Sequence, residues 1–296
     1  MLLLTGATGL IGSALLDRLV ADGQPVRCLV RDPRRLGPQR VRVQIALGDL
    51  GEPRSFRNAM RGVDTVVHLA TATRDQATTS IEELTAMAGW GLLQAAQRAG
   101  VARFVLLCGL GASAHHPARL LRAQAVAEQA VQEAELPSTV IATSLAYAPG
   151  DRWISLVERL SLLPVVLVPG QGRALCQPIW VEDLADCIVA LLGRPSREAH
   201  ERYELAGPQT ISYDEAIRAV LRSVGRERPL LHVPAAIASR ALHLLERAAG
   251  PGAPLTWDEA QLLRADSISL RGPADAQALG VVPQAMRAVL GFHPTP

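Results

Sequence analysis

Three glycines at intervals of three residues, Gly6, Gly9 and Gly12, lie between a short apolar run and a stretch with helical apolar spacing. Such a turn suits anion binding, because glycines permit a tight bend and let a ligand approach the backbone closely. The first amides of the following helix would face the anion at the positive end of the helix dipole. The pattern therefore predicts a pyrophosphate-binding loop. The residues expected to form it are Gly6, Thr8, Gly9, Leu10, Ile11 and Gly12.

A parallel sheet is the architecture that places such a loop between a strand and a helix. Continuous apolar runs, typical of buried strands, alternate with stretches whose apolar residues recur every three or four positions. The expected strands are Met1–Leu4, Val26–Val30, Val41–Leu47, Thr65–Leu69, Phe104–Cys108 and Thr139–Ala142. The clearest helical stretches are Ile11–Val20, Phe56–Met60, Leu84–Ala99 and Leu120–Ala134. This alternation predicts an α/β fold of the Rossmann type, a doubly wound parallel sheet covered on both faces.

The pattern changes after about residue 148, where Pro-Gly pairs at 149–150 and 169–170 separate further helical stretches. We expect a smaller, mainly helical C-terminal lobe, with Pro178–Leu192 returning to the sheet. The predicted domains are residues 1–148 with about 174–193, and residues 149–173 with 194–296. Two stretches of the lobe, Trp153–Leu163 and Ala236–Ala249, are amphipathic. The favoured interpretation is a helix that covers the pocket, and the alternative is a membrane-surface or partner-binding helix.

The spacing GxxGxxG in TGATGLIG resembles the short-chain dehydrogenase/reductase superfamily, specifically its extended and atypical branches. Further segments that resemble the family follow in the expected order: VRCLVRDPRRL, GDL, GVDTVVHLA, AGVARFVLL, PIWVEDLADCIVALL and YELAGPQTISYDEAI. The chain is most similar to atypical members such as the NmrA-like and complex I accessory-subunit-like proteins. The resemblance implies NAD(P)(H) binding. It places Asp49 and Leu50 of GDL at the adenine, and Leu69 and Ala70 beside the cofactor at the end of the fourth strand.

Arginines follow the second strand, where proteins that prefer NAD usually carry a carboxylate for the ribose hydroxyls. Here the strand ends in Arg31, with Arg34 and Arg35 close behind and Asp32 between them. Because a guanidinium binds a 2′-phosphate well, NADP(H) is favoured over NAD(H), with Arg31 and Arg34 as candidate ligands. The alternative is that these arginines are solvated surface charges and that Asp32 only caps the turn at Pro33.

Active members of the superfamily carry a Tyr-x-x-x-Lys pair on the helix after the fifth strand, where the lysine lowers the pKa of the tyrosine. In this chain Leu120 occupies the tyrosine position and Gln124 the lysine position. Cys108 and Gly109 stand where the family's serine is expected. Gln124 can still hydrogen-bond the nicotinamide ribose, but it carries no charge. We therefore assign no catalytic residue.

Few other titratable side chains could replace the missing tyrosine, lysine and serine as proton donors. All 30 basic residues are arginine, so no lysine is available elsewhere. The loop pair His115-His116 could donate a proton near neutral pH, although exposed loop histidines are the favoured interpretation. His68 is expected in the core or against the cofactor, Cys108 as a buried thiol, and Tyr147 as a pocket-lining residue.

The overall composition excludes several classes of protein. The 296 residues are 49% hydrophobic and carry a net charge of only +2, which argues against a disordered chain and against nucleic acid as a partner. The four cysteines are dispersed, so no metal site is expected. No apolar stretch is long enough to span a bilayer, and we expect a cytoplasmic protein. The sequence does not decide whether the protein forms a homo-oligomer.

Two functions from different classes follow. The missing tyrosine, lysine and serine favour a cofactor-dependent sensor or a protein that supports a complex. The alternative is an NADPH-dependent reductase of a quinone-like or enone substrate, with the proton supplied by water, substrate or a histidine. A deep apolar cleft beside the nicotinamide would favour the reductase. A cleft filled by side chains such as Trp90 or Leu120 would favour the sensor.

Overall fold

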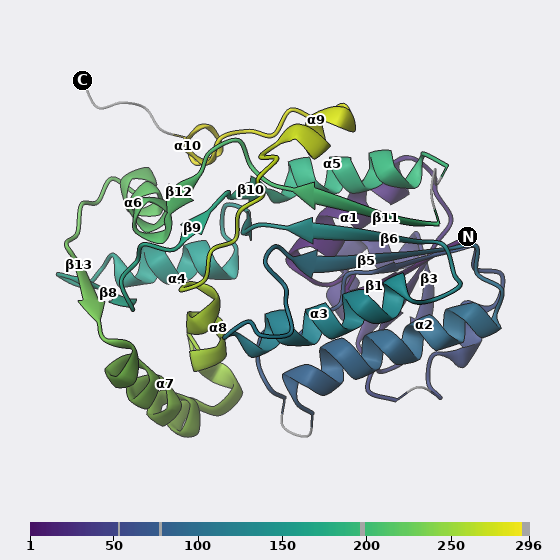
Figure 1. Cartoon of the computed structure of the whole chain (residues 1–296), viewed down its shortest axis with the longest axis horizontal. Coiled ribbons are helices and arrows are strands. Elements are labelled where there is room, and N and C mark those ends of the chain that lie inside the picture. The colour runs from purple at the N-terminus through teal and green to yellow at the C-terminus, as the bar shows by residue number, and fades with distance from the viewer. Residues whose placement is uncertain (53, 77–78, 196–198, 292–296) are drawn as a thin grey trace.

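A seven-stranded parallel sheet forms the centre of the larger domain in the computed structural model, which describes residues 1–52, 54–76, 79–195 and 199–291 (Figure 1). The strands are β1 (Leu2–Thr5), β2 (Val26–Val30), β3 (Gln44–Leu47), β4 (Thr65–His68), β5 (Arg103–Gly109), β6 (Ser138–Thr143) and β11 (His200–Leu205). Their spatial order is β11-β6-β5-β4-β1-β2-β3. The chain thus leaves β1 in one direction for β2 and returns on its other side as β4. Ligands of doubly wound sheets bind at such a switch point, beyond the carboxyl ends of the strands.

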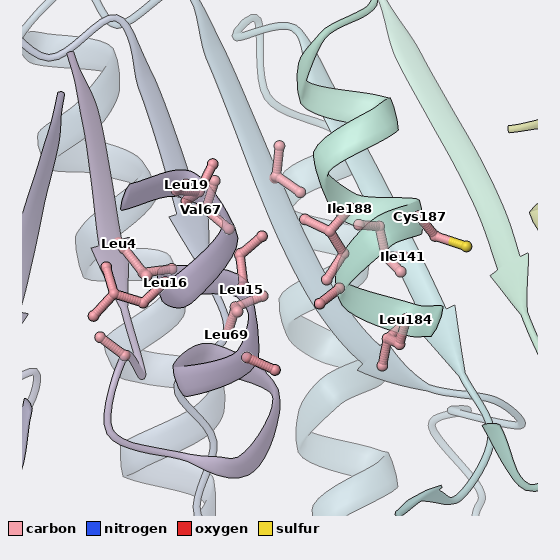
Figure 2. Close-up of a cluster of buried hydrophobic side chains, with 14 of the residues drawn as sticks. Leu4, Leu15, Leu16, Leu19, Val67, Leu69, Ile141, Leu184, Cys187 and Ile188 are labelled. Atoms are coloured by element: carbon pink, nitrogen blue, oxygen red, sulfur yellow. The ribbon is translucent and has the colours of Figure 1, made fainter. Parts of the chain in front are cut away.

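Helices cover both faces of this sheet, as the apolar periodicity predicts. On one face lie α1 (Leu10–Ala21) and α5 (Val181–Leu192), and on the other α2 (Ala88–Arg98) and α3 (Arg119–Gln132). Figure 2 shows Leu15 and Leu16 of α1 and Ile188 of α5 directed at the strands, where they form one buried cluster with Leu4 and Val67. The Rossmann-type fold is therefore confirmed.

Shorter helical segments connect these elements. They are η1 (Pro33–Val41), η2 (Arg57–Met60) and the π-helical turn η3 (Glu83–Met87), which continues directly into α2.

The C-terminal lobe is mainly helical and has its own core. Its helices are α4 (Arg152–Leu160), α6 (Tyr213–Ser223), α7 (Ala235–Ala249), η4 (Gly250–Gly252), α8 (Trp257–Leu262), α9 (Ala274–Ala278) and α10 (Met286–Val289). Short strands pair as β7 (Ala146–Tyr147) with β10 (Ile179–Trp180), β8 (Val166–Pro169) with β13 (Leu230–Val233), and β9 (Leu175–Cys176) with β12 (Ile211–Ser212). The buried side chains of α4 and α6 pack together with Tyr147 and Val166. The lobe lies beyond the carboxyl edge of the sheet (Figure 1).

Two strands lie elsewhere than the sequence pattern suggests. β11 belongs to the range expected for the C-terminal lobe, 194–296, yet it is the edge strand of the main sheet and pairs with β6 over six residues. β10, which lies in the segment Pro178–Leu192 expected to return to the sheet, pairs with β7 outside the main sheet. The helix after β10 does return to the sheet, since Leu184 and Ile188 of α5 are buried in one cluster with Ile141 of β6. Ion pairs of Arg18 with Glu182 and Asp186 join α5 to α1. Residues 196–198 and 292–296 of the predicted lobe lie outside the described part of the chain.

Candidate cofactor site

β1 runs directly into the glycine turn, and close backbone contacts fix two of its glycines. Gly6 has a φ of +76°, and a Cβ there would lie 2.6 Å from the backbone nitrogen of Ala70. A Cβ on Gly12 would lie 2.0 Å from the carbonyl oxygen of Gly6. Only glycine therefore lets the end of β1, the end of β4 and the first turn of α1 approach this closely.

The first turn of α1 presents its backbone N–H groups without a capping side chain. Gly9 is the N-cap residue, and the first turn contains no acidic residue. The first helical hydrogen bond runs from Ser13 N–H to the Gly9 carbonyl at 2.9 Å, so the amides of Leu10, Ile11 and Gly12 precede it. These amides at the positive end of the helix form a cradle that fits a pyrophosphate. All six predicted loop residues lie in this turn: Gly6, Thr8, Gly9, Leu10, Ile11 and Gly12.

The end of β4 forms one side of the turn. Leu69 N–H donates to the carbonyl of Thr5 at 3.2 Å, which places Leu69 and Ala70 beside β1. His68, one residue earlier, is buried, and its Nδ1 lies 2.7 Å from Oγ1 of Thr5. Burial lowers the pKa of His68 to about 4, so the imidazole is neutral near pH 7. His68 is therefore a core residue, one of the two positions expected for it.

Arg31 and Asp49 meet beyond the carboxyl ends of β2 and β3. Nη1 of Arg31 donates to Oε1 of Gln76 at 2.7 Å and lies 3.9 Å from Oδ2 of Asp49. The turn orients the Asp49 carboxylate, since its Oδ1 accepts from Gly51 N–H at 2.9 Å. Both side chains remain about half exposed. Leu50, also predicted at this site, is half-buried against the core.

The acidic residue between the arginines is engaged by the chain itself. Oδ1 of Asp32 accepts from the backbone N–H of Arg34 at 2.9 Å and so caps the turn that begins at Pro33. The side chains of Arg34 and Arg35 are exposed. At the end of β2, Asp32 thus spends one carboxylate oxygen on a helix cap, and the other carboxylate described beside Arg31 is that of Asp49.

At the positions of the family's catalytic pair, the structure contains a buried leucine and an engaged glutamine. Leu120 is buried at the start of α3. Oε1 of Gln124 accepts from the backbone N–H of Gly109 at 2.8 Å and ties α3 to the end of β5. Gln124 Nε2 donates to no other group within the described residues, so it is available to a ligand oxygen.

The remaining candidate acids are poorly placed for proton transfer. Burial raises the pKa of Cys108 and of Tyr147, and both side chains are fully covered. Nδ1 of His116 accepts from Ala118 N–H at 3.0 Å, and burial lowers the pKa of this ring. His115 is exposed in the same loop. Trp90 does not fill a cleft, because its side chain is half exposed on the outer face of α2 beside Gln94 and Glu133.

A cluster of ion pairs joins α8 to the loops at the carboxyl edge of the sheet, and the sequence pattern gave no sign of it. Nη2 of Arg74, in the loop after β4, lies 2.7 Å from Oε2 of Glu259. Nη1 of Arg119, the residue before Leu120, lies 3.2 Å from Oδ2 of Asp258. Arg119 also pairs with Glu82 at 2.6 Å and thereby lowers the pKa of that carboxyl. We refer to the pairs of α8 with Arg74 and Arg119 as the α8 clamp.

Comparison with known proteins identifies the family. A family model described as NAD(P)H-binding matches residues 6–151. The NAD(P)H azoreductase of Xenophilus azovorans is 30% identical over 229 residues, which cover 76% of this chain and 74% of the azoreductase. The chain is an atypical member of the short-chain dehydrogenase/reductase superfamily. This atypical dehydrogenase/reductase binds NAD(P)(H), and the range matched by the family model begins at Gly6, the first glycine of the turn.

Two further proteins are similar to this atypical dehydrogenase/reductase. Alpha subcomplex subunit 9 of the mitochondrial NADH dehydrogenase (ubiquinone) of Arabidopsis thaliana is 29% identical over 239 residues, and the chain spans 58% of that subunit's length. The structure of an NADPH-dependent quinone oxidoreductase from Escherichia coli, complexed with NADPH, superposes with a TM-score of 0.75 at 16% identity and covers 98% of both chains. At this identity the superposition shows a shared fold. None of the described helices is long and apolar enough to cross a membrane.

Proposed function

We propose that this protein binds NADP(H) and works as a cofactor-dependent sensor or as a support protein in a complex, without the acid–base chemistry of its family. The α8 clamp carries this proposal. Arg119 precedes the position of the missing tyrosine and Arg74 follows β4, so both anchor points of α8 lie at the edge where the nucleotide would bind. Occupancy of that edge would therefore change how firmly the C-terminal lobe is held.

The preference for NADP(H) rests on Arg31. The side chain of Arg31 is half exposed at the edge where the adenosine would lie. Its guanidinium contacts the neutral Gln76 and, at a longer distance, Asp49. A 2′-phosphate would form shorter, charge-assisted hydrogen bonds with it. Oδ1 of Asp32 is already engaged by the cap of the next turn, which leaves this carboxylate less capacity to accept from ribose hydroxyls.

The chain's own residues would bind and orient the cofactor, and none of those that the structure describes is placed to transfer a proton. A bound nicotinamide would supply or accept hydride. The α1 amides would hold the pyrophosphate, and Nε2 of Gln124 would donate to a ribose hydroxyl while Oε1 stays on Gly109. Leu120 would keep water away from the position that the tyrosine occupies in active relatives.

Reduction of a quinone-like or enone acceptor is the second candidate. Two similar proteins are named as an azoreductase and a quinone oxidoreductase, and both names describe reduction of conjugated acceptors. Such acceptors suit a site without a strong acid, because the reduced product is less basic than an alkoxide. The relative from the mitochondrial NADH dehydrogenase supports the first candidate, since its name places it in a complex. The cytoplasmic location stays a prediction.

Calorimetric titration with NADPH and NADH tests the cofactor assignment. We expect NADPH to bind more tightly than NADH, and Arg31→Ala to weaken NADPH binding by about 10–100-fold, the equivalent of one charged hydrogen bond. Arg35→Ala is the matched control, since it removes an exposed arginine four residues away. Equal affinities for both nucleotides in the unmodified protein would contradict the preference for NADP(H).

Oxidation of NADPH in the presence of a benzoquinone and an azo dye separates the two functions. The sensor proposal predicts that absorbance at the nicotinamide band stays constant after binding is established. Turnover that is lost in Gln124→Ala but retained in Gln129→Ala, a change on the exposed side of α3, would favour the reductase.

A further inference from the structure

Helix α7 exposes its apolar face. Ala238 is its only buried residue, whereas Ile237 and Leu244 are 57% and 64% exposed. Ile237, Ala241, Leu244 and Ala248 follow one another at intervals of three or four residues, so they share one side of the helix. This differs from the expectation that the helix covers a pocket. The apolar stripe points away from the protein.

Further exposed aliphatic side chains lie at the same end of the C-terminal lobe. Leu167 of β8 and Leu231 of β13 are register partners, and both are at least half exposed. Leu162 and Leu163, before β8, are exposed as well. Of the 18 large hydrophobic residues exposed in the described chain, eight lie within residues 159–168 and 222–249. We call these two segments the distal surface; β8, β13 and α7 stand at the end of the molecule away from the sheet (left in Figure 1).

The distal surface is also basic. It contains six arginines and two glutamates, which leaves 24 arginines against 26 acidic residues in the rest of the chain. Arg240 and Arg247, seven residues apart, border the apolar stripe of α7 along one side. The six arginines are Arg159, Arg222, Arg226, Arg228, Arg240 and Arg247.

Some of these arginines adjoin the exposed leucines directly. Nη1 of Arg226 donates to Oγ of Ser161 at 2.8 Å, and Nε of Arg228 donates to the carbonyl of Leu163 at 3.0 Å. These acceptors are uncharged, so they do not neutralise the guanidinium groups. Together with Arg218 and Arg222, both arginines line an open cavity of about 440 Å³.

We propose that the distal surface docks on a bilayer that contains anionic phospholipid. An amphipathic helix of this kind lies in the interface with its apolar face in the acyl boundary, while arginines at its border reach the phosphates. The charge distribution favours this occupant over a second copy of the chain. A self-association through the distal surface would bring two sets of six arginines together, whereas an anionic lipid surface neutralises them.

Flotation with lipid vesicles tests the proposal on the full chain. We expect the protein to float with vesicles of phosphatidylcholine and phosphatidylglycerol, to bind pure phosphatidylcholine vesicles much more weakly, and to dissociate as salt is raised. Ile237→Ser/Leu244→Ser should reduce partitioning at least tenfold, and Arg240→Gln/Arg247→Gln should do the same on anionic vesicles. Val126→Ser/Val282→Ser is the matched control, because it removes two exposed aliphatic side chains elsewhere.

Other outcomes would overturn the proposal. Absence of flotation with anionic vesicles would do so, as would an equal loss in the control variant. Light scattering during size-exclusion chromatography gives a third outcome: an oligomer that Ile237→Ser/Leu244→Ser converts to monomer, without any vesicle binding, would assign the surface to a second copy. NADPH affinity should stay unchanged in all three variants, since none touches the cofactor site.

Discussion

Gln124 shows how one substitution can remove chemistry and keep geometry. A lysine at this position would lower the pKa of a neighbouring tyrosine by its charge, which an amide cannot do. The amide instead holds the backbone of Gly109 through Oε1 and leaves its N–H₂ group free to donate to a ligand. At the residue scale, the site is therefore built for binding rather than for proton transfer.

His68 predicts a loss of stability in mild acid. Its pKa is about 4 in the folded protein, below the ordinary 6.5, so the unfolded chain binds more protons between these values. As the pH falls from 7.5 to 4.5, this residue alone should lower the free energy of unfolding by about 2–3 kcal/mol. Urea denaturation at the two pH values measures the change. His68→Gln keeps a hydrogen-bonding group beside Thr5, and its free energy of unfolding should fall by about 2–3 kcal/mol less over the same pH range. An identical pH dependence in both proteins would refute the low pKa of His68.

At the scale of elements, α8 is held by charge. Arg74 and Glu259 are both mostly buried, and Glu259 also closes the capping box of α8 with Thr256. Glu259→Gln keeps an acceptor for the cap but removes the charge facing Arg74. We expect it to lower the free energy of α8 opening by about 1–3 kcal/mol, seen as roughly 5–150-fold faster hydrogen exchange in α8.

Helix α6 offers a matched control for this change. Glu215 closes the same kind of capping box with Ser212, and among the described residues its carboxylate forms no ion pair. Glu215→Gln should leave exchange in α8 unchanged. If the two variants affect α8 equally, the clamp does not hold the helix.

The sequence allowed the central elements to be predicted because buried parallel strands consist of continuous apolar runs. The strand expected at Val26–Val30 has these bounds in the structure, and the glycine turn lies where its spacing placed it. β11 was missed, since HERYEL contains only two apolar residues, Tyr203 and Leu205, and so lacks the continuous apolar run that marks the other strands. The α8 clamp was missed for another reason. Arg74 and Glu259 are 185 residues apart, and no local sequence pattern predicts an ion pair at that distance.

At the scale of the whole molecule, nucleotide binding should raise thermal stability. A ligand that binds only the folded state at 100 times its Kd contributes about 2.7 kcal/mol. For a chain of this length we expect NADPH to raise the Tm by about 4–5 °C, and Arg31→Ala to shift the required concentration upward. Differential scanning fluorimetry with NADPH and with NADH measures the effect. An unchanged Tm at saturating NADPH would mean that the folded protein has no preference for the nucleotide.

The position of β11 has a consequence for how the protein is made. β6 is buried along its whole length, but its partner on one side is β11, which the ribosome delivers only after residues 144–199. At roughly 5–20 residues per second, the edge of β6 stays bare for some seconds of synthesis. An uncovered, apolar strand edge pairs readily with other chains. The nascent chain is therefore most in need of a chaperone after six of its seven sheet strands have emerged.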